Sequence, residues 1–252
     1  DMDNKDKIGG RAYNNGLRLR NNQYSVKVYY DQDDNLKIKT QKVITSKYME
    51  YIKKIPVIRG IAALLVAIFS FLKEVFKNPY KYWFIFLIIF ADIIYVSLPA
   101  STGAVYQEIF LIIYFAIPIV LIFIFRNSVS EVFKFHGAEH KAVNYYEDNY
   151  KRDMASYSRI HRRCGSNIIF FYIIFTIIAS FFNIGVNVFI QNLFILGLSY
   201  EVMKITPEKL LIFPAMFQKI VTKEPEQRQL EAAKLALQAL LYESETQEKL
   251  RK

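Results

Sequence analysis

The fold is decided by one apolar run, IIFFYIIFTIIASFFNIGVNVFIQNLFILGLSYEVM, which occupies residues 168–203. A helix that crosses the hydrocarbon core of a bilayer needs about 20 apolar residues, so this run is too long for one straight span. Asn183 and Gly185 interrupt it near its middle, and both residue types favour turns. We therefore predict a transmembrane hairpin over residues 167–203, with helices at 167–182 and 186–203.

Earlier apolar segments lie at residues 57–72, 82–100 and 109–125. The last two are long enough to predict a second transmembrane hairpin over residues 82–125. The first begins with Pro56, Arg59 and Gly60, which favour a re-entrant or interfacial helix over residues 56–77. With 53% hydrophobic residues, the composition also favours a membrane protein. The predicted fold is mainly α, a polytopic helical membrane protein with about four transmembrane helices.

The distribution of Lys and Arg predicts the orientation of these helices. There are 12 in residues 1–56, eight in 126–167, nine in 204–252 and none in 101–108. Cytoplasmic loops carry the excess of Lys and Arg, so both termini and the central loop are expected in the cytoplasm. A fifth span at residues 57–72 would place the basic N-terminal region outside. The net charge of +10 is then explained most simply by cationic loops held against anionic lipid, because no nucleic-acid module is visible.

The two ends of the chain are predicted to form cytoplasmic structure. Residues 1–20 lack the pattern of a secretory signal peptide, and residues 24–43 alternate apolar and polar side chains around a turn cluster at 31–35. This alternation predicts a small β-hairpin within the N-terminal region 1–55. In the C-terminal region 204–252, Thr222-Lys-Glu-Pro225 precedes apolar residues at helical spacing, which predicts an amphipathic helix.

The residues that carry chemistry cluster in the central loop, residues 126–166. All three histidines and the only cysteine fall within 29 residues. A helix without proline is predicted from Ser130 to Glu147, so His136 and His140 share one face one turn apart. His136-Gly-Ala-Glu-His140 has the inverted zincin pattern, in which two histidines bind Zn²⁺ and the glutamate, here Glu139, takes a proton from water.

Three residues compete to complete the metal shell. Glu147 lies seven residues after His140 and shares its face, whereas His161 and Cys164 lie three residues apart in the following segment. If His136, His140 and Glu147 hold the metal with water in the fourth place, the site is catalytic. If His136, His140, His161 and Cys164 close a tetrahedron, the site is structural.

Arg159, Arg162 and Arg163 lie beside this cluster. Arginine presents a rigid fork of donors suited to carboxylate or phosphate oxygens, so these residues could bind an anionic substrate. They could equally be stop-transfer charges before the span at residue 168, an explanation that fits Arg162 better than Arg163.

These motifs resemble the YqhQ family of bacterial membrane proteins. The resemblance rests on Phe135-His-Gly-Ala-Glu-His-Lys141, Tyr146-Glu147, Ser158-Arg-Ile-His161 and Arg163-Cys-Gly165, with Gly9-Gly10 to Gly16 similar to the glycine-flanked opening motif of the family. Asn15 stands where the family usually has Glu, and Arg162 where it has Pro. The resemblance implies a metal site and a bacterial plasma membrane, but no substrate.

The leading functional hypothesis is a zinc-dependent membrane hydrolase. Zn²⁺ on His136 and His140, with Glu147 or His161, would activate a water, Glu139 would take its proton, and Arg163 would stabilise the oxyanion. The bond cleaved is a peptide bond by preference, or an ester or amide in a lipid.

Two hypotheses of other classes compete. In the first, a structural metal staples the loop of a non-enzymatic membrane factor, whose basic face binds the translocation machinery, ribosomal RNA or anionic lipid. In the second, Asp92 inside a predicted span and the broken last apolar run indicate a transporter.

Overall fold

The computed structural model describes residues 6–44, 47–52, 54–80, 82–83, 85–86, 89–90, 108, 112, 116–117, 119–182 and 185–251. The chain divides into two compact units. The first combines Asp1–Ile61 with Ser128–Lys252, and the second is Ala62–Asn127. The first unit contains the sheet and all of the residues predicted to bind metal.

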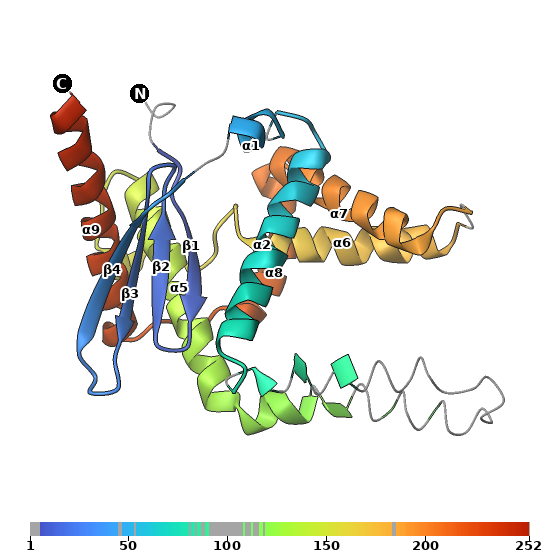
Figure 1. Cartoon of the computed structure of the whole chain (residues 1–252), viewed down its shortest axis with the longest axis horizontal. Coiled ribbons are helices and arrows are strands. Elements are labelled where there is room, and N and C mark those ends of the chain that lie inside the picture. The colour runs from blue at the N-terminus through green and yellow to red at the C-terminus, as the bar shows by residue number, and fades with distance from the viewer. Residues whose placement is uncertain are drawn as a thin grey trace. The chain divides into compact units, whose positions relative to one another are not determined.

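A four-stranded antiparallel sheet opens the first unit (Figure 1). Its strands follow each other in chain order: β1 (Gly9–Tyr13), β2 (Gly16–Arg20), β3 (Tyr24–Tyr30) and β4 (Leu36–Lys42). Side chains along β3 alternate between buried and half-buried, as expected where one face of a sheet packs on a core. The predicted β-hairpin covered only β3 and β4, so it was too small by two strands.

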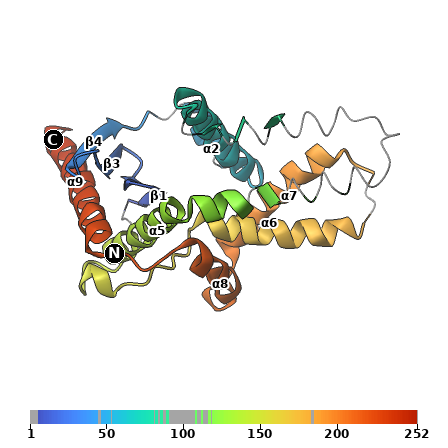
Figure 2. The same ribbon diagram turned by 90° about the horizontal axis from the view of Figure 1, so that it is seen from below.

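Two helices supply the other half of this core. Helix α9 (Gln227–Arg251) packs against β2 and β3, and helix α5 (Arg126–Glu147) adds buried side chains to the same cluster (Figure 2). Small residues in α9 allow its close packing on β2 and β3. The fully buried members are Leu17, Leu19, Val26, Val28, Ala138, Ala142, Ala232, Ala233, Ala236 and Leu240.

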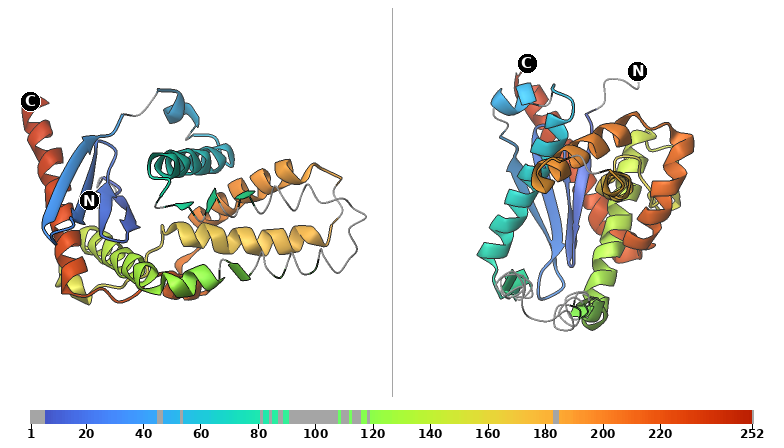
Figure 3. Two further views of the ribbon diagram at one scale, coloured as in Figure 1. Left: turned by 60° about the horizontal axis from the view of Figure 1, so that its bottom comes forward. Right: turned by 90° about the vertical axis from the view of Figure 1, so that its right-hand side faces the viewer.

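The remaining helices are α1 (Lys47–Ile52), α2 (Ile58–Lys77), α6 (Gly165–Ser180), α7 (Val188–Ile205) and α8 (Ile212–Val221), with 3₁₀ helices η2 (Met154–Ser156) and η3 (Glu208–Leu211). Helices α6 and α7 pack side by side, and α8 packs on α6 (Figure 3). The hydroxyl of Tyr172 donates to Asn192 Oδ1 across the α6–α7 pair at 2.7 Å. Most of the Ile and Phe side chains on this pair remain exposed.

The prediction of about four transmembrane helices is wrong. Within the described residues, α7 is the one helix long and apolar enough to cross a membrane, and α6, with 16 residues, is shorter. The chain instead combines its helices with a four-stranded sheet that has its own core. The predicted spans at 82–100 and 109–125, and with them Asp92, lie largely or wholly outside the described residues.

The start of α2 is joined to α7 by a paired charge. The guanidinium of Arg59 forms an ion pair with Glu201, whose Oε1 also accepts from the Val57 amide at 3.0 Å. Val57 has a φ of +65°, a strained conformation for a β-branched residue. A Cβ on Gly197 would lie 2.7 Å from the Val57 carbonyl oxygen, so glycine there permits the close approach of the two segments.

We expect Leu17→Ala to lower the free energy of unfolding by about 2–5 kcal/mol, because it leaves a cavity in the core. Leu17 is 0% exposed, whereas Ile38 on β4 is 49% exposed. Urea unfolding followed by circular dichroism should therefore show a much smaller loss for the control, Ile38→Ala. Equal losses in the two variants would contradict the assigned core.

Candidate metal centre

Helix α5 presents His136 and His140 one turn apart, with their ring centroids 4.5 Å from each other. The Nδ1 atom of His136 lies 3.0 Å from the Val221 carbonyl oxygen, and that of His140 lies 2.6 Å from the Arg159 carbonyl oxygen. A carbonyl oxygen only accepts, so each Nδ1 carries the proton and each Nε2 keeps a lone pair. Backbone carbonyls in this position are the usual orienting partners of metal-binding histidines.

Cys164 completes a group of three donors. Its Sγ lies 3.5 Å from His136 Nε2, and the ligand atoms of His136, His140 and Cys164 all lie within 4.8 Å of one another. Zinc bonds of about 2.0–2.1 Å to nitrogen and 2.3 Å to sulfur place two tetrahedral ligands about 3.5 Å apart. The measured separation from Sγ to Nε2 therefore fits one edge of a zinc tetrahedron.

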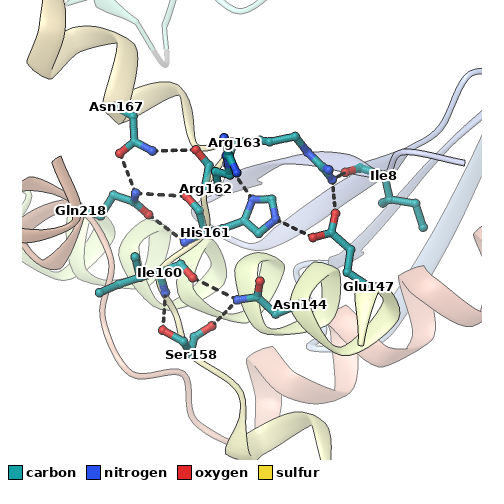
Figure 4. Close-up of polar contacts among 10 residues, drawn as sticks. All are labelled: Ile8, Asn144, Glu147, Ser158, Ile160, His161, Arg162, Arg163, Asn167 and Gln218. Atoms are coloured by element: carbon teal, nitrogen blue, oxygen red, sulfur yellow. Dashed lines mark hydrogen bonds and ion pairs between the residues drawn. The ribbon is translucent and has the colours of Figure 1, made fainter. Parts of the chain in front are cut away.

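Glu147 and His161 lie outside this group and contact each other. His161 Nε2 is 3.2 Å from Glu147 Oε2, and Arg163 forms an ion pair with the same carboxylate (Figure 4). Seven residues along a helix advance about 10.5 Å, which explains why Glu147 shares the face of His140 without reaching its ligand atom. The ring of His161 is held 5.8 Å, centroid to centroid, from that of His140.

The loop that carries His161 and Cys164 is anchored by buried amides. Gln218 on α8 accepts from the His161 amide at 3.0 Å and donates to the His161 carbonyl at 3.1 Å. It also donates to Asn167, which in turn donates to the Arg162 carbonyl (Figure 4). These contacts hold the chain on both sides of Cys164, from His161 to Asn167 in the first turn of α6.

Glu139 lies between the histidines and the sheet. Its Oε2 is 3.9 Å from His136 Nε2, and its side chain is buried. Burial raises the pKa of this carboxyl to about 8. A Cβ on Gly10 of β1 would lie 2.6 Å from Glu139 Cγ, so only glycine allows the strand to pass this close to the carboxylate.

A cavity of about 180 Å³ opens beside these residues. Its walls come from α5, from the segment 161–165 and from the start of β1. Arg163 lines it, but the guanidinium donates to the Ile8 carbonyl at 3.0 Å and pairs with Glu147. The role of Arg163 in stabilising an oxyanion stays a prediction.

Burial also sets the protonation of the donors. Burial lowers the pKa of His136. Burial and, to a smaller extent, the nearby imidazole of His136 lower the pKa of His140 to about 3. Burial raises the pKa of the Cys164 thiol, against the hydrogen bond with Ser166. The lowered pKa values favour neutral imidazoles at His136 and His140, and metal ligands must be neutral histidines.

Glu147 has a different electrostatic environment. Partial burial acts to raise the pKa of its carboxyl, but His161 and Arg163 outweigh burial and hold that pKa below its usual value.

The segment 221–225 is the part of the site that the sequence motifs did not predict. It runs along α5: the Lys223 amide donates to the Phe133 carbonyl at 2.9 Å, and Arg159 donates to the Thr222 carbonyl. A Cβ on Gly137 would lie only 2.1 Å from the Lys223 carbonyl oxygen. The two glycines, Gly10 and Gly137, were the available signal, because buried close approaches select glycine.

The family model described as "Protein of unknown function (DUF1385)" matches residues 55–243. The match includes the His136–Cys164 cluster and leaves the four strands outside. "Uncharacterized protein YqhQ" of Bacillus subtilis (strain 168) is 35% identical, over an alignment that covers 42% of this chain and 39% of that protein. The alignment thus spans about two fifths of the relative. No solved structure matches the chain.

We expect Gly137→Ala to lower the melting temperature by several degrees. Alanine normally stabilises a helix by about 1 kcal/mol relative to glycine, but here its Cβ must displace the Lys223 carbonyl. Gly165 is the matched control, since a Cβ there meets nothing within 4 Å. Gly165→Ala should leave the melting curve unchanged or raise it, and a loss as large as that of Gly137→Ala would refute the proposed packing.

Proposed function

The chain belongs to the DUF1385 family and is similar to YqhQ, and we propose that it is a zinc-dependent hydrolase with its site at a membrane surface. One observation carries the proposal. The ligand atoms of His136, His140 and Cys164 converge, and Glu139 stands beside them. Three protein ligands with a fourth position left open are typical of catalytic zinc.

The donor set fits zinc by its chemistry. Two neutral imidazoles and a thiolate are ligands that Zn²⁺ prefers over Mg²⁺ or Ca²⁺, which take oxygen. When bound, zinc supplies Lewis acidity and lowers the pKa of a water at the open position to about 7. The Val221 and Arg159 carbonyls fix the imidazole rings in the orientation that this binding needs.

Glu139 is the residue that we assign as general base. It follows His136 by three residues, so its carboxylate lies on the ligand face of α5, 3.9 Å from His136 Nε2. Its side chain is largely buried and lines the cavity beside the histidines. From this place it would accept a proton from a water molecule in the cavity and donate it to the leaving group.

The wall of the cavity favours an extended polypeptide as substrate. Gly9 and Gly10 line it and are exposed, and β1 is an outer strand of the sheet in the described part of the chain. Outer strands bind extended peptides through their backbone groups. A cavity of about 180 Å³ is smaller than a usual ligand pocket, so we propose that only a short part of an extended chain enters it while the rest lies along β1.

The apolar helices support a membrane location. Cys164 immediately precedes α6, and α6 and α7 expose Ile and Phe side chains such as Ile173, Ile177, Phe189 and Phe194. Large contiguous apolar surfaces of this kind mark contact with lipid or another protein. We propose that this pair of helices enters the lipid of a bacterial plasma membrane and holds the His136–Cys164 cluster near its surface.

The structural-metal alternative receives less support. It requires His161 as fourth ligand, but His161 Nε2 lies against Glu147. Among the described residues, the ligand group consists of His136, His140 and Cys164.

We expect purified protein to bind one Zn²⁺ per chain, and His140→Ala or Cys164→Ser to lose it. His161→Ala is the control, and it should keep the metal because His161 lies outside the ligand group. Metal content is measured by mass spectrometry after dialysis against a weak chelator. Loss of zinc in His161→Ala, with zinc retained in Cys164→Ser, would show that the ligand set is wrong.

Glu139→Gln should retain zinc and lose turnover by about 10²–10⁴-fold, because the amide cannot accept the proton. Activity is measured on a quenched fluorescent peptide library with the full chain in nonionic detergent. The control is Glu131→Gln, the same change on the same helix, where the carboxylate pairs with Lys134 instead. Full activity in Glu139→Gln, at equal zinc content, would rule out Glu139 as the base.

A further inference from the structure

The outward face of the sheet carries an uninterrupted row of cations. The strand register places Arg11 opposite Arg18, Arg18 opposite Lys27, and Lys27 opposite Lys39. Neighbouring strands lie about 4.8 Å apart, so the row crosses the sheet over about 14 Å. Each strand contributes one positive charge, and we define these four residues as the basic row.

No acidic side chain balances the basic row within the strands. The four described strands, GGRAY, GLRLR, YSVKVYY and LKIKTQK, contain no Asp or Glu. Like charges directly opposite each other destabilise a sheet. The phosphate groups of a bound ligand would relieve this repulsion between the strands.

The row lies on the face opposite the core. Leu17, Leu19, Val26 and Val28 point inward to α5 and α9 and are fully buried. Residues of the basic row alternate with them along β2 and β3 and are half-buried, while the row's ends, Arg11 and Lys39, are exposed. The strands present this face to the viewer in Figure 1.

Two tyrosines are interleaved with the cations. Lys27 Nζ lies 4.4 Å from the ring centroid of Tyr13 and 5.0 Å from that of Tyr29. The guanidinium groups of Arg11 and Arg18 lie 5.5 and 5.7 Å from the Tyr13 ring. Aromatic rings among cations on a four-stranded sheet provide both charge for phosphates and flat surfaces for bases.

We propose that this face binds single-stranded nucleic acid. The basic row contacts successive phosphates, and Tyr13 and Tyr29 stack against bases. Single strands fit better than duplexes, because only unpaired bases can stack on Tyr13 and Tyr29. The inference is independent of the metal chemistry, since the basic row lies on the face of the sheet that points away from α5.

The geometry favours nucleic acid over a lipid surface. Helices α6 and α7 run across the direction of the strands and away from the sheet in Figures 1 and 3. If these helices enter lipid, the outward face of the sheet is turned sideways to the bilayer rather than laid against it. The phosphates of a flexible strand can reach such a face, whereas those of a planar bilayer cannot cover it.

The test uses the full chain in nonionic detergent and a fluorescein-labelled, mixed-sequence 12-nucleotide RNA, with binding measured by anisotropy from 50 to 400 mM NaCl. Four phosphate contacts predict a slope of log K against log salt of about −3. Arg11→Gln/Lys39→Gln should reduce the slope to about −1.4 and weaken binding by about tenfold at 100 mM. Lys219→Gln/Lys234→Gln removes the same charge from exposed positions on α8 and α9 and should change neither value.

Tyr13→Leu tests the stacking separately. It should weaken RNA binding about fivefold or more while the salt slope stays the same. Urea unfolding checks that the variants are folded. Arg11→Gln/Lys39→Gln removes like-charge repulsion, so its urea midpoint of unfolding should equal or exceed that of the unmodified protein. Anionic vesicles of phosphatidylglycerol and polyglutamate are the competing probes. Three outcomes would each overturn the proposal. The first is binding to vesicles without binding to RNA, and the second is equal binding of polyglutamate and RNA. The third is an equal loss of RNA affinity in the two double variants.

Discussion

The structure depends on the close approach of the segment 221–225 to helix α5. Only the missing side chain of Gly137 lets the Lys223 carbonyl lie against the helix. The same approach carries the Val221 carbonyl to His136 Nδ1 and the Thr222 carbonyl to Arg159, whose own carbonyl orients His140. One tight contact between two backbones thus orients both imidazoles, while the opposite face of α5 packs in the core with the sheet and α9.

Near this contact, ion pairs and hydrogen bonds hold Glu147 and His161 away from the ligand atoms of His136, His140 and Cys164. Glu147 is occupied by His161 and Arg163, and His161 is held at both its amide and its carbonyl by Gln218. These satisfied groups leave Cys164 as the third donor near the histidines. The residues of the candidate site are therefore determined by the contacts of Glu147 and His161 as well as by the His-x-x-Glu-His spacing.

The predictable part of the protein was local. Helical spacing predicted that His136 and His140 lie one turn apart, and the structure places Cys164 beside them. Their role as metal ligands stays a prediction. The choice between Cys164 and Glu147 was not predictable, because it depends on where α6 begins relative to α5. The strands β1 and β2 were missed since they are short, rich in Gly and Arg, and gain their order from pairing with β3. The count of membrane helices failed because apolar length alone does not determine how a segment folds.

The hydrogen bond between His136 and Val221 joins residues 85 positions apart. A ribosome adds about 5–20 residues each second, so the Val221 carbonyl emerges about 4–17 s after His136. During that interval the imidazole has no fixed orientation, and the three donors cannot yet be held as a set. If the site binds metal as proposed, the three donors would come together late in synthesis, after helices α6 and α7 have been made. The complete set of donors can therefore form only after residues 136–221 have been synthesised and folded together.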